Sequence, residues 1–260
     1  MNARARAARP RQPRRERASA LATYLHESRD IGLSLMMVLP LLLAYEIVML
    51  CVTVPVRNGA EAATLNLLQQ LPAASLVALR RGIVLLLMVV SLALLLRKRP
   101  KVARARWVLV EALLLSLALG PFVSALVGGV GLSASASATS GANAGQAPAW
   151  LPFLLSVGAG LWEELVFRLA LLGGLAFVLA RAFKVPQRAA LASAIIVSSL
   201  AFALYHHVGE SGEPLEAGRF AFRAIAGTIL GVLFAFRGLA VVVYMHVFYD
   251  LICDLRTLHG

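Results

Sequence analysis

Long apolar runs follow one another along the chain, and each has about the length needed to cross a hydrocarbon core of ~30 Å. Short polar links separate them. We therefore predict an all-α, polytopic transmembrane helix bundle with about seven spans. The expected spans are at about residues 33–54, 82–96, 108–128, 151–180, 189–207, 220–236 and 239–255.

The links between these runs alternate in charge. The N-terminal tail and residues 97–106 and 181–188 are basic, whereas residues 133–149 are uncharged and residues 209–218 are acidic. By the positive-inside rule, this pattern predicts a cytoplasmic N-terminus and a C-terminus on the far side. Residues 64–81 mix apolar and polar positions and are expected to form an amphipathic helix on the far surface.

Composition places the chain outside the soluble globular class, since 60% of its 260 residues are hydrophobic and the mean hydropathy is +0.79. The net charge of +12 comes from two basic patches, residues 4–17 and 97–106. Patches beside spans are typical of cytoplasmic flanks on anionic lipid, so the bilayer is the expected partner and nucleic acid is not. Heavy use of Ala, Leu and Arg suggests a bacterial source, so the expected location is the bacterial inner (plasma) membrane.

The chain divides into four predicted parts. Residues 1–30 form a basic, disordered cytoplasmic tail, and residues 31–130 hold the N-terminal transmembrane helices. Residues 131–149 are a flexible linker of low complexity. Residues 150–256 form the helix bundle that carries the candidate chemistry.

Three charged residues interrupt the fourth span, where each costs about 2.5 to 3.5 kcal/mol at the bilayer centre. Glu164 and Arg168 stand four positions apart with the acid first, which favours an ion pair along one helical face. Glu163 is turned about 100° away from Glu164. One glutamate can therefore be structural while Glu163 stays free.

Other ionisable groups lie in later spans. Phe202 and His206 end the fifth span, and His246 and Asp250 stand one turn apart in the seventh. Together with Glu163, they can form either a metal site or an acid–base site that activates water. At about 1.5 Å per residue, His206 is expected about 25 Å from the cytoplasmic start of its span, further out than the other groups.

In this order, Glu-Glu-x-x-x-Arg, Phe-x-x-x-His and His-x-x-x-Asp resemble the motifs of the CPBP family of intramembrane proteases, which includes the CAAX prenyl endopeptidases and is also called the Abi family. The motif residues here are Glu163, Glu164 and Arg168; Phe202 and His206; and His246 and Asp250. The resemblance covers about residues 150–255. Family members often have Gly where Leu169 stands, Asn where Asp250 stands, and eight spans.

The resemblance implies that Glu163 is the water-activating base and that His206 and His246 are oxyanion or ligand groups. Asp250 would orient these groups, with Glu164, Arg168 and Phe202 as support. The metal remains open: Zn²⁺ or another divalent ion could be held by His206, His246 and Asp250, or glutamate-activated water could act without one. The implied activity is endopeptidase cleavage of a membrane-associated or C-terminally anchored protein.

Two other functions compete with this one. A non-catalytic immunity or scaffold protein could use the same bundle to bind a partner, and a proton-coupled transporter could also need intramembrane charges. Retention of every catalytic residue type favours the enzyme, and the lack of a sequence repeat disfavours the transporter. We expect Glu46, Glu111 and Arg223 to be structural partners or to line a cavity, and Gly227 and Gly231 to let helices pack closely.

Overall fold

The computed structural model describes residues 20–51, 73–98, 105–132, 150–208 and 212–259, and the rest of the chain lies outside this description. The described residues form helices joined by short connections, with no strand among them, so the all-α prediction is confirmed. The helices are α1 (Ala20–Glu27), α2 (Ile31–Cys51), α4 (Ala73–Lys98), α5 (Ala105–Gly129), α6 (Leu151–Glu163), η2 (Glu164–Gly173), α7 (Gly174–Arg181), α8 (Gln187–Tyr205), α9 (Ala217–Arg237) and α10 (Leu239–His259).

Helix is present at each of the seven predicted positions. Four helices in the described part are long and apolar enough to cross a membrane: α2, α5, α8 and α9. Helix α4 carries a shorter apolar stretch at Arg81–Leu94. These helices identify an integral membrane protein with a polytopic helical bundle.

Two predictions for the N-terminal half change. The tail predicted as disordered over residues 1–30 contains α1 from Ala20, because residues beyond the arginine-rich stretch are mainly apolar or neutral and pack on other helices. The amphipathic helix predicted for residues 64–81 lies outside the description up to residue 72, and from Ala73 the chain already belongs to α4. The predicted linker falls mostly on residues 133–149, which are also outside the description.

Helix α10 lies in the middle of the bundle and contacts α2, α5, α6, η2 and α9. Its first half is apolar on nearly every side, as expected for a helix with neighbours all round. The buried residues there are Leu239, Ala240, Val241, Val242, Val243, Met245 and Val247. They belong to one hydrophobic core that also includes buried residues of α2 and α5.

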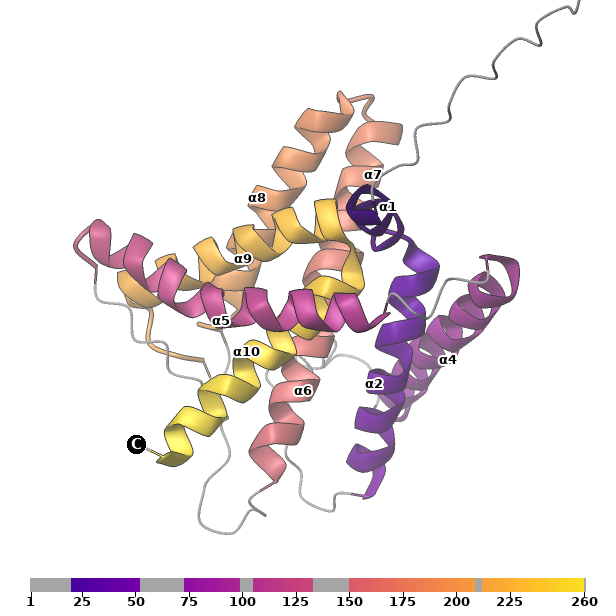
Figure 1. The fold of residues 1–260 in the computed structure, drawn as a ribbon, viewed down its shortest axis with the longest axis horizontal. Helices are drawn as coiled ribbons and strands as arrows, with labels where there is room; N and C mark the ends of the chain where they lie inside the picture. The colour runs from indigo at the N-terminus through magenta and orange to yellow at the C-terminus, as the bar shows by residue number, and fades with distance from the viewer. Residues whose placement is uncertain (1–19, 52–72, 99–104, 133–149, 209–211, 260) are drawn as a thin grey trace, which may run out of the picture.

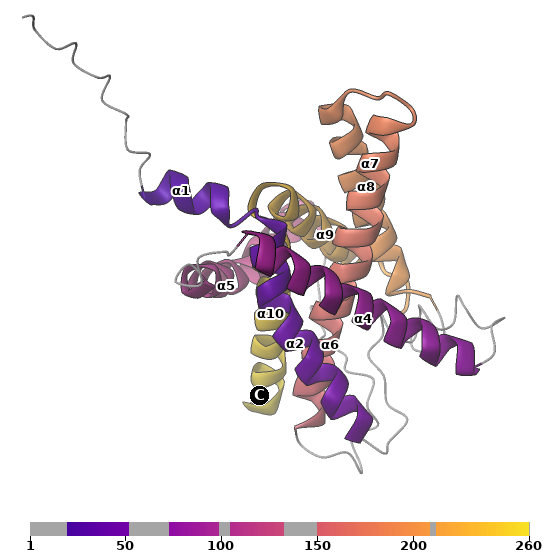
Figure 2. The same cartoon turned by 90° about the vertical axis from the view of Figure 1, so that its right-hand side faces the viewer.

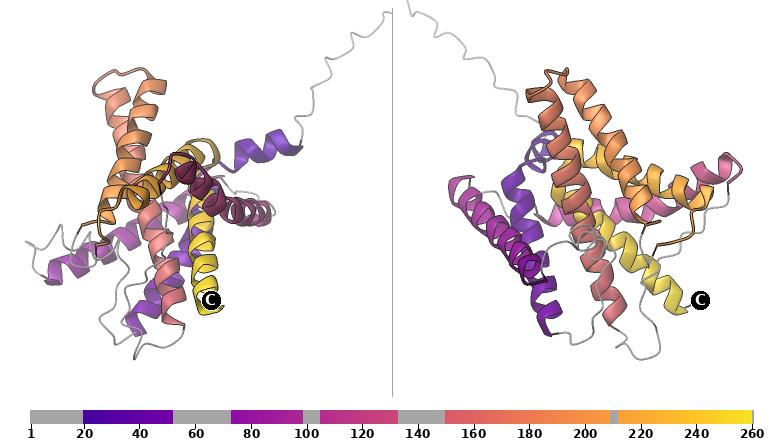
Figure 3. Two further views of the ribbon diagram at one scale, coloured as in Figure 1. Left: turned by 90° about the vertical axis from the view of Figure 1, so that its left-hand side faces the viewer. Right: turned by 180° about the vertical axis from the view of Figure 1, so that it is seen from behind.

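The outer faces of α4 and α5 carry large apolar side chains. On α4, Leu85 and Leu86 are 60% and 62% exposed, and on α5, Leu114 and Phe122 are 62% and 56% exposed. Figure 3 shows α4 at the edge of the molecule, where it packs against α2. Such surfaces are typical of helices that contact lipid rather than water.

A buried polar cluster joins α1 to the corner between α9 and α10. Arg237 donates two hydrogen bonds of 2.6 Å to the Glu111 carboxylate and one of 2.8 Å to Ser28. The Tyr24 hydroxyl donates to the same carboxylate. Gly238 forms the corner with φ +87°, and a Cβ there would lie 2.8 Å from the Ser28 carbonyl oxygen, so glycine is required. The expectation that Glu111 has a structural partner is thus confirmed.

Helices α6, η2 and α7 form one continuous helix, and α8 returns antiparallel beside it (Figure 1). Helices α5 and α9 run across this pair rather than along it, as the perpendicular view also shows (Figure 2). Counted from the turn between α7 and α8, Glu163 and His206 are both about 27 to 29 Å along their helices at ~1.5 Å per residue. The expectation that His206 lies too far outward was wrong, because the helix containing Glu163 is longer than the hydrocarbon thickness.

Candidate active site

The helix that carries the paired glutamates changes its winding at the site. Glu163 is the last residue of α6, and Glu164 begins the π-helical segment η2, which continues to Gly173. Segments with π-helical bonds are rare, are mostly a single turn long, and occur frequently at functional sites. Both glutamates are buried, Glu163 at 5% and Glu164 at 0% exposure.

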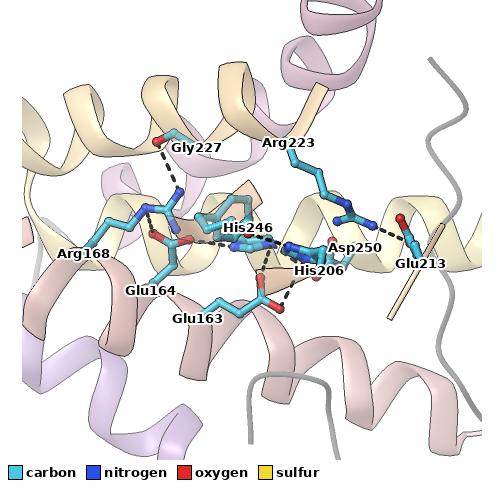
Figure 4. Close-up of polar contacts among 10 residues, drawn as sticks. Glu163, Glu164, Arg168, His206, Glu213, Arg223, Gly227, His246 and Asp250 are labelled. Carbon is cyan, nitrogen blue, oxygen red and sulfur yellow. Dashed lines mark hydrogen bonds and ion pairs between the residues drawn. The ribbon is translucent and has the colours of Figure 1, made fainter. Parts of the chain in front are cut away.

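Glu163 lies between two histidines that come from different helices. Its Oε1 is 3.8 Å from His206 Nε2 at the end of α8, and its Oε2 is 3.6 Å from His246 Nε2 in α10 (Figure 4). These distances are slightly too long for direct hydrogen bonds. A water molecule can contact a glutamate oxygen and a histidine nitrogen together across either gap.

Glu164 holds the closed end of the site. Its Oε2 is 3.2 Å from Arg168 Nε, and neither side chain is exposed. Its Oε1 accepts a hydrogen bond of 2.7 Å from His246 Nδ1. Glu164 therefore neutralises Arg168, as the spacing predicts, and also orients His246, which the sequence did not indicate.

Phe202 and Arg168 support the histidines from behind. The Arg168 guanidinium lies 4.4 Å from the centre of the Phe202 ring and donates a hydrogen bond of 3.3 Å to the Gly227 carbonyl oxygen. The Phe202 ring packs edge-on against His206, with 4.8 Å between centroids. His206 Nδ1 donates a hydrogen bond of 2.8 Å to the Phe202 carbonyl oxygen, which leaves the other ring nitrogen, Nε2, directed at Glu163. All the predicted supporting residues thus adjoin the site.

Two glycines of α9 let that helix approach α8 closely. A Cβ on Gly227 would lie 3.1 Å from the Phe202 ring, and one on Gly231 would lie 3.3 Å from Ile195. The close packing predicted for this pair of glycines is confirmed. It also brings the Gly227 carbonyl within reach of Arg168.

Asp250 lies one turn beyond His246, and its Oδ2 is 3.6 Å from His246 Nε2. This distance is longer than a hydrogen bond, so His246 is held by Glu164 and only faces Asp250. The Asp250 side chain is 20% exposed and the His206 side chain 15%, in contrast to the enclosed Glu164. The site is therefore closed at Arg168 and more accessible near Asp250.

Arg223 of α9 borders the accessible end. Its Nη2 donates a hydrogen bond of 2.5 Å to Glu213 Oε1, in the segment between α8 and α9 (Figure 4). Two hydrogen bonds connect the Glu213 backbone to the end of α8. Its N–H donates a hydrogen bond of 2.9 Å to the His206 carbonyl oxygen, and its carbonyl oxygen accepts one of 3.0 Å from His207 Nδ1. The sequence marked Arg223 only as a structural or cavity residue.

The donor atoms of the predicted metal set suit zinc in kind, because imidazole and carboxylate are common zinc ligands. Within the described residues, no group of three or more His, Cys, Asp or Glu side chains is arranged so that it could hold a metal ion. The divalent metal on His206, His246 and Asp250 stays a prediction.

The comparisons with known proteins point to one family. Residues 145–252 match the family model of the Rce1-like type II CAAX prenyl endopeptidases. Searches of curated proteins and of solved structures each found no match. The matched residues contain all seven motif positions, the helices α6 to α9 and the first two thirds of α10. The resemblance to the CPBP family is confirmed over residues 145–252, which are similar to its Rce1-like type II CAAX prenyl endopeptidases.

Proposed function

We propose that this integral membrane protein is an intramembrane endopeptidase that hydrolyses a peptide bond in a membrane-associated or C-terminally anchored protein. The observation that carries the proposal is the position of Glu163, a buried carboxylate with one oxygen facing His206 and the other facing His246. We further propose a bacterial inner membrane with the N-terminus in the cytoplasm, as the alternating charge of the links indicates.

The reaction begins with a water molecule beside Glu163. The carboxylate takes a proton from this water while the hydroxide oxygen forms a bond to the scissile carbonyl carbon. The carbonyl oxygen becomes an oxyanion, and an N–H of His246 stabilises it, since Nε2 faces the site and Nδ1 is held by Glu164. The orientation of His206 by the Phe202 carbonyl keeps its Nε2 toward the water.

Collapse of the tetrahedral intermediate completes the hydrolysis. Glu163, now protonated, gives its proton to the amide nitrogen as the carbon–nitrogen bond breaks. The products are a carboxylic acid on one fragment and an amine on the other; the acid then gives its remaining proton to the amine or to solvent, and Glu163 has regained its charge. Burial of the site between α6, α8 and α10 excludes bulk water and strengthens each of these electrostatic interactions.

The proposal is tested with Glu163→Gln, which keeps the shape of the side chain and removes the base. The purified full chain is reconstituted in liposomes and incubated with a prenylated CAAX peptide, the substrate type that the family description names. Membranes that express either form are also compared for newly formed peptide ends. We expect kcat to fall by about 10² to 10⁴-fold, the usual contribution of a positioned general base, without loss of folding.

Glu216→Gln is the matched control, because Glu216 is a 55% exposed acid that pairs with Arg219 away from the site. This variant should cleave like the wild type. Cleavage by Glu163→Gln at the wild-type rate contradicts the proposal. If the folded wild-type chain produces no new peptide ends in either assay, the non-catalytic immunity or scaffold function is favoured instead.

A further inference from the structure

Arg223 keeps binding capacity that its contacts within the protein do not use. A guanidinium carries five N–H donors in a planar fork. Among the described residues, Arg223 has one hydrogen-bond partner, the Glu213 carboxylate at 2.5 Å. The Arg223 side chain is 21% exposed, whereas Arg168, the arginine at the other end of the site, is fully enclosed.

The guanidinium of Arg223 also lies close enough to the site to act on its charged groups. Arg223 interacts electrostatically with Glu163, Asp250 and His206. Figure 4 shows the Arg223 side chain reaching from α9 toward Glu213, at the same end of the site as Asp250 and His206. A peptide that reaches Glu163 from the accessible end must therefore pass close to a positive charge.

We propose that Arg223 binds the C-terminal carboxylate of the peptide substrate. A carboxylate matches the planar fork of a guanidinium and forms charge-assisted hydrogen bonds with it. Three acidic groups border the site, Glu163, Asp250 and Glu213, and without Arg223 they would repel such an anion. The inference rests on the proposed peptidase function, because it concerns how that site holds its substrate.

Glu213 sets the strength of this subsite. Its carboxylate holds Arg223, and its backbone is bonded to His206 and His207 at the end of α8. A substrate carboxylate shares the guanidinium with Glu213 or displaces it. Neutralising Glu213 should therefore tighten the binding of an anionic peptide end and leave a neutral end unaffected.

Binding of two probe peptides to the purified full chain in detergent tests the inference. The probes are N-acetyl-trileucine with a free carboxylate and the same peptide with a C-terminal amide, and the Kd of each is measured by titration calorimetry. We expect the wild type to bind the acid at least about tenfold more tightly than the amide, as a charge-assisted pair provides. Arg223→Gln should abolish this preference, and Arg223→Lys should keep part of it.

Arg219→Gln is the matched control. Arg219 lies one turn earlier on α9 and pairs with Glu216 at 3.1 Å, so its loss changes the net charge equally without touching the subsite. It should keep the wild-type preference. If Arg223→Gln does not fold, Glu213→Gln decides: the acid should bind more tightly and the amide should be unchanged.

Three results overturn the inference: equal affinity of the wild type for both probes, no binding of the acid at millimolar concentration, or an unchanged preference in Arg223→Gln. An unchanged affinity of Glu213→Gln for the acid overturns it as well. Because probe binding needs no turnover, these failures leave the peptidase proposal standing. Conversely, a chain without peptidase activity can still show the preference.

Discussion

Replacing Glu164 with glutamine should separate the stabilising role of this residue from its role in the site. The Glu164 carboxylate is 3.2 Å from the Arg168 guanidinium, and both side chains are fully buried. The other contacts of Arg168 are neutral, the Gly227 carbonyl at 3.3 Å and the Phe202 ring at 4.4 Å. Glu164→Gln therefore leaves the buried guanidinium without the only carboxylate that contacts it among the described residues.

The expected loss in the free energy of unfolding is about 3 to 5 kcal/mol, the usual result of removing one partner of a buried ion pair. Removing both charges avoids the uncompensated ion, since a buried pair can often be replaced by apolar groups at little cost. The double variant Glu164→Gln/Arg168→Met should therefore be at least about 1 kcal/mol more stable than Glu164→Gln alone.

The double variant should regain stability relative to Glu164→Gln but should not regain activity. Both variants lose the charged acceptor that holds His246 Nδ1 at 2.7 Å, so kcat should fall about 10- to 100-fold in each. Unfolding by denaturant in mixed micelles, followed by tryptophan fluorescence, gives the stabilities, and peptide cleavage gives kcat. An exposed acid, Glu216, provides the control, and its change to Gln should cost at most about 1 kcal/mol. A double variant less stable than Glu164→Gln, or one with restored kcat, would refute the reasoning.

Three further changes test other parts of the structure. Glu111→Gln weakens the hydrogen bonds from Arg237, so the free energy of unfolding should drop by about 1 to 3 kcal/mol; a lower kcat per folded molecule would contradict a purely structural role. Gly160→Ala places a Cβ 2.8 Å from the Val247 nitrogen, so it should lower the free energy of unfolding by about 1 to 3 kcal/mol and should also reduce kcat. Gly174→Ala has open space around it and should not lower the free energy of unfolding. Dialysis against a zinc chelator should leave cleavage unchanged, because the proposed reaction uses Glu163 to activate water; a loss of cleavage that added Zn²⁺ restores would contradict this and support the predicted metal.

The sequence allowed much of the fold to be predicted, because apolar run length and charged links determine where membrane helices begin and end. The different contacts of the two glutamates were also predictable: the spacing along one helix pairs Glu164 with Arg168 and turns Glu163 toward other residues. These are local properties, in which the relevant residues lie within a turn or two of each other.

The contacts between distant helices could not be predicted in this way. The hydrogen bond from His246 to Glu164 joins residues 82 positions apart, and nothing in either motif distinguishes it from a bond between His246 and Asp250. The depth of His206 relative to Glu163 depended on where the helix of Glu163 begins, and this helix, α6 to α7, is longer than the hydrocarbon core is thick. Arg223 is likewise placed at the site by the crossing of α9 over α8, which no periodicity encodes.

The hydrophobic core extends beyond the residues that match the family model. Residues 145–252 contain the motifs, yet α10 packs on α2 and α5, which precede that range, and the corner at Gly238 rests on Ser28. An isolated fragment of the matched residues would present the apolar face of α10 to lipid or detergent and lose the partner of Arg237. The family match thus covers the motif residues, whereas the unit that can fold also needs the helices before it.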